Sequence, residues 1–180
     1  MNDTIIDKLY EDNKEILVLL DASGDVSSRS ILDNNFKKVL LLSAASYFEY
    51  EITSILTNYI CKKTNNNPLL LCFFKKKAIE RQFHTYFKWE KRNANHFFYM
   101  FGEDFKKEIE LEIKDNPHLD NSVKAFLDIG LIRNNLVHNN FADYPLDKTS
   151  EEIYSLYKEA LKFIEYISKK LPNYVPSNAS

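Results

Sequence analysis

Arg133 and His138 carry the side chains best suited to chemistry on a phosphate group, and they lie in the segment Arg-Asn-Asn-Leu-Val-His. The planar guanidinium group of an arginine holds two phosphate oxygens at once and stays charged. A histidine can accept or donate a proton near neutral pH, because its ordinary pKa is about 6.5. The pair therefore indicates a site that binds an anion and transfers protons.

Both residues interrupt the apolar helix pattern of residues 123–138. At about 100° per residue, Arg133 lies near Ile129 on the helical wheel, and His138 lies near Leu127. We therefore expect both side chains on buried faces. Because burying an unpaired guanidinium is costly, we expect Arg133 to meet a carboxylate, a partner chain or a bound anion.

The elements that must position these side chains are helices. Three glycines and five prolines in 180 residues, with long stretches of Leu, Ile, Phe, Tyr, Lys and Glu, favour helices over a sheet with tight turns. Helices are predicted near residues 4–21, 30–62, 68–90, 94–113, 121–138 and 150–171. The predicted fold class is all-α: a single-domain bundle of five to six helices over residues 1–171, with a flexible C-terminal tail over residues 172–180.

Several features bound the class of protein. No apolar run approaches the roughly 20 residues that span a bilayer, and the amino terminus lacks the basic region of a signal peptide. We therefore expect a cytoplasmic protein without a membrane partner. Cys61 and Cys72 lack metal-ligand spacing, which predicts reduced thiols and no metal site. His84, His96 and His118 are expected to be structural or surface histidines.

Arg133, the following Asn134 and His138, near the end of a bundle helix, resemble the signature of the HEPN family. The resemblance implies a HEPN-like helical bundle. It also implies a metal-independent endoribonuclease without a cofactor, because many HEPN proteins form such a site where two protomers bring their arginine and histidine together.

A second constellation lies in the predicted helix of residues 30–62. Glu49 shares a stripe with Ala45 and Ile52, so we expect it to point inward. This helix and the stretch from Asn95 to Gly102 resemble the RiboL-PSP branch of HEPN proteins, and the resemblance extends over most of residues 1–170.

The chemistry implied by the resemblance is attack of a ribose 2′-hydroxyl on the adjacent phosphorus, with a 2′,3′-cyclic phosphate as product. This reaction needs a proton acceptor, charge stabilisation and protonation of the leaving 5′-oxygen. His138 is the candidate for proton transfer, and Arg133 is the candidate for holding the scissile phosphate. Asn134 could orient His138 or the phosphate, and Glu49 could anchor Arg133 or tune His138.

The spacing of the motif raises a geometrical question. Five residues on a regular helix correspond to about 140° of rotation, so Arg133 and His138 of one chain do not project side by side. Two motif helices packed around a two-fold axis would bring each arginine to the other histidine, which predicts a homodimer. Alternatively, the helix ends near Leu136, and His138 lies in an irregular turn capped by Asn139 and Asn140. Both alternatives remain open.

The segment from Cys61 to Arg92 is strongly basic. It contains nine basic and two acidic residues, a local charge of +7 in a chain whose net charge is −2. Aromatic residues are interleaved with these charges, as on surfaces that bind RNA phosphates and stack bases. The predicted RNA-binding residues are Lys75, Lys76, Lys77, Arg81, Lys88, Lys91 and Arg92. A solvated basic face with the aromatic residues in the core explains the same pattern.

Other interpretations of the motif remain. Arg133 and Glu49 could form a structural ion pair, and His138 could be a core histidine. The chain could also be a non-catalytic HEPN module that binds RNA, a nucleotide or a partner protein, or a structural helical adaptor. HEPN ribonucleases often serve as toxins in toxin-antitoxin or phage-defence systems, so the resemblance suggests an antitoxin or another regulatory partner.

Overall fold

The structure is a computed structural model that describes residues 3–175. The chain forms two compact units, with the boundaries inside three long helices. Unit 1 comprises Met1–Tyr47 and Ile129–Lys158, and unit 2 comprises Phe48–Asp128 and Glu159–Ser180. Each unit is described by itself.

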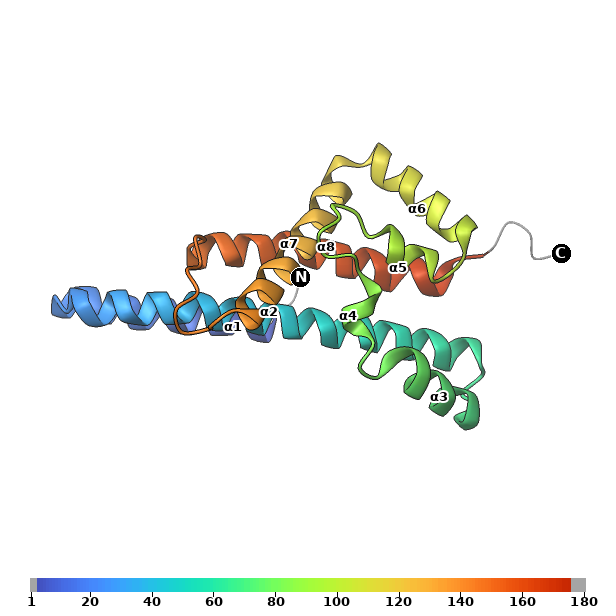
Figure 1. Cartoon of the computed structure of the whole chain (residues 1–180), viewed down its shortest axis with the longest axis horizontal. Helices are drawn as coiled ribbons and strands as arrows, with labels where there is room; N and C mark the ends of the chain where they lie inside the picture. Colours follow the sequence, from blue (N-terminus) through green and yellow to red (C-terminus); the bar gives the residue numbers. More distant parts are fainter. Residues whose placement is uncertain (1–2, 176–180) are drawn as a thin grey trace. The chain divides into compact units, whose positions relative to one another are not determined.

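The predicted all-α fold class is confirmed, because residues 3–175 contain helices and no strand (Figure 1). The helices are α1 (Ile5–Ser23), α2 (Val26–Lys63), α3 (Pro68–Phe74), the π-helix η1 (Lys75–Ile79), α4 (Phe83–Tyr86), α5 (Asn95–Tyr99), α6 (Glu103–Asp115), α7 (Pro117–His138) and α8 (Ser150–Asn173). The four long predicted helices appear as α1, α2, α7 and α8. The predicted helices near residues 68–90 and 94–113 are each divided.

These divisions have local backbone causes. Arg81 adopts a positive φ of 60°, which ends η1, and the chain after Tyr86 is extended at Phe87 before the loop that leads to α5. Gly102 has a φ of 107° and a ψ of 160°, a conformation essentially restricted to glycine, and it separates α5 from α6. A helical wheel contains no signal for either break.

In unit 1, the start of α1 is bound to α8. Thr4 and Asp7 form a capping box, and the Asp7 carboxylate also accepts hydrogen bonds from the Tyr154 hydroxyl (2.6 Å) and the Lys158 amine (2.9 Å). Burial alone would raise the pKa of Asp7. The hydrogen bonds that it accepts from Tyr154, Thr4 and Lys158 outweigh burial and hold this pKa well below its usual range. Tyr10 stacks on Tyr154 with ring centroids 3.9 Å apart.

The start of α8 follows its sequence pattern. The Thr149 backbone N–H donates to Glu152, and the Glu152 N–H donates to the Thr149 hydroxyl, so these residues form a capping box at the start of the helix predicted near residues 150–171. The Ser150 hydroxyl donates to the Asp33 carboxylate of α2 at 2.8 Å. These bonds attach the first turn of α8 to α2 within unit 1.

Unit 2 is built around an aromatic core. Phe87 contacts Phe97 and Phe126 at centroid distances of 4.9 and 4.8 Å, and Phe126 contacts Phe163 of α8 at 5.1 Å. The Tyr86 hydroxyl donates to the Ala78 carbonyl at 2.5 Å, and burial raises the pKa of Tyr86 to about 12. Many aromatic residues of the basic segment therefore pack in the core.

The C-terminal part of α8 extends beyond the predicted end. Pro172 and Asn173, predicted as the start of the tail, lie in α8, and the ring of Tyr174 packs edge-on against Phe105 at 4.8 Å. The remainder of the predicted tail, residues 176–180, lies outside the described residues.

Helix α2 is long and apolar enough to cross a bilayer by length and composition, with a mean hydropathy of 1.2 in its most apolar window. This differs from the expectation that no apolar run approaches the length that spans a bilayer. Core helices of soluble proteins pass the same test, and α2 contributes buried core residues to each unit, among them Leu40, Leu41, Phe48 and Ile52.

Candidate active site

Arg133 is half-buried near the C-terminal end of α7, rather than fully buried as predicted. Its Nη1 donates to the side-chain oxygen of Asn134 at 3.2 Å. No carboxylate among the described residues of unit 1 pairs with its guanidinium group.

His138 is exposed, so the prediction that it lies on a buried face is wrong. The wheel placed it beside Leu127, but the last turn of α7 has no covering element over this side, and Val137 and Asn139 are exposed as well. The imidazole makes no hydrogen bond within the described part of unit 1. Its two ring nitrogens are therefore open to a proton donor or acceptor from outside.

The helix is regular through the motif. Helix α7 extends to His138, and the Asn139 N–H still donates to the Asn135 carbonyl at 3.2 Å. The alternative in which the helix ends near Leu136 is therefore wrong. The rotation of about 140° between Arg133 and His138 applies, and one copy of the helix does not bring the two side chains together.

Glu49 does not point inward, contrary to the prediction. The buried positions of this part of α2 step by four residues, from Ala44 through Phe48 to Ile52. Glu49 follows Phe48 and is therefore rotated by about 100° from it, which leaves the carboxylate exposed. It also belongs to unit 2, whereas Arg133 belongs to unit 1.

Two lysines of α2 hold the loop that follows His138. Neither was among the residues expected to be functional. The Lys38 amine donates to the Phe141 and Ala142 carbonyls at 2.7 and 3.0 Å, and the Lys37 amine donates to the Leu146 carbonyl at 2.7 Å. Lys38 is buried and lies 5.3 Å from the centre of the Phe141 ring. The sequence feature that could have indicated a buried lysine is the position of Lys38 between the core residues Phe36 and Leu40.

A family model described as RiboL-PSP-HEPN matches residues 7–173, a range that contains the whole motif and most of each unit. The chain belongs to the RiboL-PSP-HEPN family. The resemblance found in the sequence is therefore confirmed. No curated protein and no solved structure matches the chain.

The predicted RNA-binding residues of this HEPN chain are all exposed. Lys75, Lys76 and Lys77 lie in η1, Arg81 follows it, and Lys88, Lys91 and Arg92 lie in the loop before α5. Of the interleaved aromatic residues, Phe73 and Phe74 are exposed, whereas Tyr86 and Phe87 are buried. Tyr86 and Phe87 therefore agree with the alternative in which the basic residues face solvent and the aromatic residues lie in the core.

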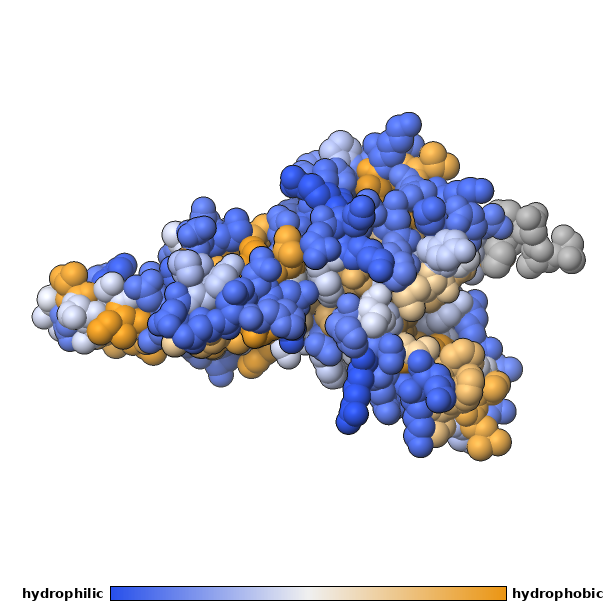
Figure 2. All heavy atoms as spheres, in the orientation of Figure 1, coloured by the Kyte–Doolittle hydropathy of each residue, from blue (hydrophilic) through white to orange (hydrophobic). Residues whose placement is uncertain are grey.

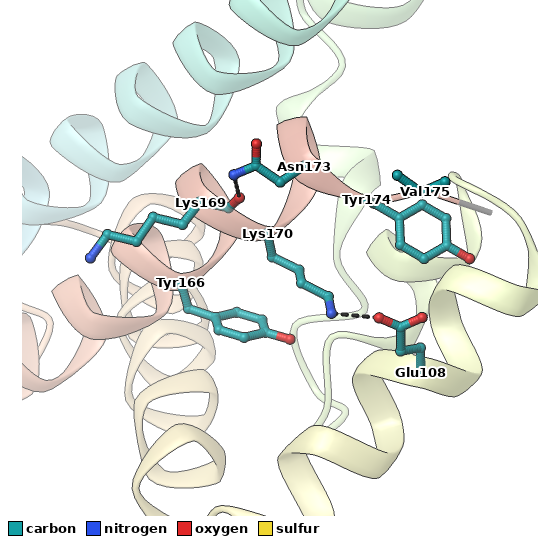
Figure 3. A pocket seen from close by; sticks show the side chains of 7 residues that line it. All are labelled: Glu108, Tyr166, Lys169, Lys170, Asn173, Tyr174 and Val175. Carbon is teal, nitrogen blue, oxygen red and sulfur yellow. Dashed lines mark hydrogen bonds and ion pairs between the residues drawn. The ribbon is translucent and has the colours of Figure 1, made fainter. Parts of the chain in front are cut away.

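Two pockets of the HEPN chain are lined by residues outside the motif. The pocket in unit 2 has a volume of about 380 Å³ and is lined by α6 and α8 (Figure 3). Its Lys170 amine lies 2.5 Å from Glu108 and 2.5 Å from Glu112. The Tyr166 hydroxyl donates to Glu112 at 2.6 Å, so these groups already satisfy one another.

The pocket in unit 1 has a volume of about 610 Å³ and surrounds the start of α1. Its Asp7 is held by Thr4, Tyr154 and Lys158, as described above. Within residues 3–175, no group of three or more His, Cys, Asp or Glu side chains could hold a metal ion, and Cys61 and Cys72 are free thiols.

Proposed function

We propose that the protein is a metal-independent endoribonuclease whose active site is shared between two copies of the chain. One observation carries the proposal. Arg133 and His138 lie on one regular helix, the arginine without a carboxylate partner in its unit and the histidine open to solvent. Membership of the HEPN family, whose domains are often ribonucleases, supports the same assignment.

The reaction would need only these side chains. His138 accepts the proton of the ribose 2′-hydroxyl as its oxygen forms a bond to phosphorus. Arg133 binds two equatorial oxygens and stabilises the negative charge of the phosphorane. The bond from phosphorus to the 5′-oxygen then breaks, and the imidazolium formed at the same His138 donates its proton to that oxygen, so that each site needs one arginine and one histidine, supplied by different copies. The products are a 2′,3′-cyclic phosphate and a free 5′-hydroxyl.

The surroundings of His138 support a homodimer. Val137 and Phe141, on either side of His138 in the chain, are both exposed large apolar residues. A two-fold contact through this part of unit 1 would cover them and place each arginine near the other copy's histidine. Asn134, which already accepts from Arg133, would help to orient the guanidinium group. Glu49 has no assigned contact with this site and is the least supported member of the predicted set.

RNA is the proposed substrate because exposed cations are concentrated in one segment of unit 2. The seven predicted RNA-binding residues lie between Lys75 and Arg92, and all are exposed. Cations in such a segment attract the RNA backbone without reading its sequence. We further propose a cytoplasmic toxin of a toxin-antitoxin or phage-defence system, under the control of a partner protein. Growth arrest on induced expression that requires His138 would test this role.

The catalytic assignment is tested by RNA cleavage in excess chelator. Purified protein is expected to cleave total RNA or tRNA, and Arg133→Ala and His138→Ala are each expected to lower the rate by about 100-fold or more. His118→Ala is the matched control, because it removes an exposed histidine outside the motif. If the parent does not cleave, or both motif variants cleave like the parent, the chain is instead a non-catalytic HEPN module.

A further inference from the structure

The helix α3 in unit 2 forms an exposed apolar surface of unusual composition. None of the seven residues of α3 is buried, and Leu69 and Phe73 are 80% and 59% exposed. Residues 52–79 contain five lysines and no acidic residue. Figure 2 shows hydrophobic residues gathered over α3, which is labelled in Figure 1. We call Leu69, Leu70, Phe73 and Phe74, with the exposed Lys62 and Lys63, the α3 surface, and Lys75, Lys76 and Lys77 remain assigned to RNA.

A second exposed apolar surface lies in unit 1, where α1 and α2 are joined at Gly24. Leu19 is 69% exposed and Val26 is 74% exposed, and Val18 and Ile31 are exposed as well. Figure 2 shows hydrophobic residues at this end of the two helices. Residues 15–33 contain four acidic residues and one arginine, a local charge of −3. We call Val18, Leu19, Val26 and Ile31, with these charges, the hairpin surface.

Monomeric soluble proteins rarely expose clustered apolar side chains without a partner. The two surfaces have opposite charges, and each offers the other large apolar groups. We propose that the α3 surface of one copy binds the hairpin surface of a second copy. This contact goes beyond the proposed ribonuclease activity and does not rest on it.

RNA and an anionic bilayer each match only one of the two surfaces. RNA could meet the lysines of the α3 surface and stack on Phe73 and Phe74, but the acidic groups of the hairpin surface repel phosphates, so RNA accounts for one of the two surfaces. An anionic bilayer fits the α3 surface but is repelled by the hairpin surface in the same way. A second copy of the chain satisfies both surfaces with one contact.

The contact joins two different surfaces, and our proposal is that a single such contact forms between any two copies, which makes it heterologous. Two copies joined in this way leave one α3 surface and one hairpin surface open, and the assembly continues into a ring or a chain. It therefore differs from the two-fold contact proposed around α7. Opposite charges at the rim would make the association weaken as the salt concentration rises.

The test uses the full-length protein, purified free of RNA, with one surface removed at a time. Variant A carries Leu69→Ser and Phe73→Ser, and variant B carries Val18→Ser and Leu19→Ser. All four positions are exposed, so neither variant disturbs the core. Leu111→Ser in α6 is the matched control, because Leu111 is exposed and lies outside both surfaces.

Light scattering should show that the average molecular mass of the parent and of the control rises with protein concentration. For variant A alone and variant B alone, the association constant should be at least about tenfold lower. Fluorescently labelled A should bind unlabelled B with the affinity of the parent, and each variant should bind itself no more than through the α7 contact. The proposal is overturned if A binds B no better than A binds A, if the parent shows no association that these variants weaken, or if association requires added RNA.

Discussion

Arg133 and His138 differ from the sequence expectation because burial depends on elements that a helical wheel does not contain. The wheel placed both on apolar faces, and it treats every turn of a helix as equally covered. In the last turn of α7, Leu136 is buried but the side that carries His138 has no cover, so His138 is exposed; Arg133, in the preceding turn, is half-buried. The motif itself could be recognised in the sequence, whereas the exposure of its side chains could not be predicted from it.

Asp7 shows how ionisation is linked to folding in unit 1. Its pKa is lowered in the folded state, so its contribution to stability is present above the ordinary carboxyl pKa of about 4 and is lost as the pH falls below it. Asp7→Asn should lower the free energy of unfolding by about 1–3 kcal/mol at pH 7. Urea denaturation followed by circular dichroism at pH 7 and pH 3 measures this loss.

At pH 3, the difference in the free energy of unfolding between Asp7→Asn and the parent should be smaller than at pH 7. Asp12→Asn, at an exposed position of the same helix, should change the free energy of unfolding little at either pH. An equal loss at both pH values would show that the charge of Asp7 does not stabilise the start of α1.

Lys38 is a buried cation that binds backbone carbonyls rather than a carboxylate. Lys38→Met preserves most of the side-chain volume but removes these hydrogen bonds, which should cost about 1–3 kcal/mol and loosen the loop over residues 139–149. Hydrogen exchange of this loop should become faster. Lys148→Met, in the same loop, is the control, and equal exchange in both variants would argue against the role of Lys38.

At the scale of elements, long amphipathic helices were predicted well and short ones were not. Thr149 and Glu152 marked the start of α8 correctly, because a capping box is a local interaction. The predicted helix near residues 68–90 is divided because Arg81 adopts a positive φ and Tyr86 and Phe87 turn into the aromatic core. The positive φ of Arg81 is a local backbone feature, whereas the burial of Tyr86 and Phe87 depends on packing against distant segments, and a helical wheel contains neither.

Gly24 and Gly102 both have positive φ, but their conformations differ. Gly24, with φ 75° and ψ 11°, is in the left-handed helical region, which asparagine tolerates, whereas Gly102 is not. Gly102→Asn should therefore lower the free energy of unfolding by about 1–3 kcal/mol. Gly24→Asn should lower it by less than about 1 kcal/mol. Thermal denaturation compares the two variants, and similar losses would contradict this conformational argument.

At the scale of the whole molecule, the proposed activity requires a second copy of the chain. One copy offers an arginine without a carboxylate partner in its unit and a histidine open to solvent, on faces of α7 that diverge by about 140°. The family membership of residues 7–173 and the exposed apolar residues Val137 and Phe141 support pairing through this helix. The spacing of the motif and the resemblance to HEPN proteins together predicted this arrangement, and the regular end of α7 removes the alternative of an irregular turn.

The most direct test mixes two inactive variants. Arg133→Ala copies retain His138, and His138→Ala copies retain Arg133, so a mixed dimer contains one complete pair formed across the two chains. After unfolding and refolding together at equal amounts, the mixture should regain about a quarter of the parent's RNA cleavage in excess chelator, since half of the dimers are mixed and each holds one intact site of two. A mixture that contains mixed dimers but cleaves no faster than either variant alone would contradict the shared site.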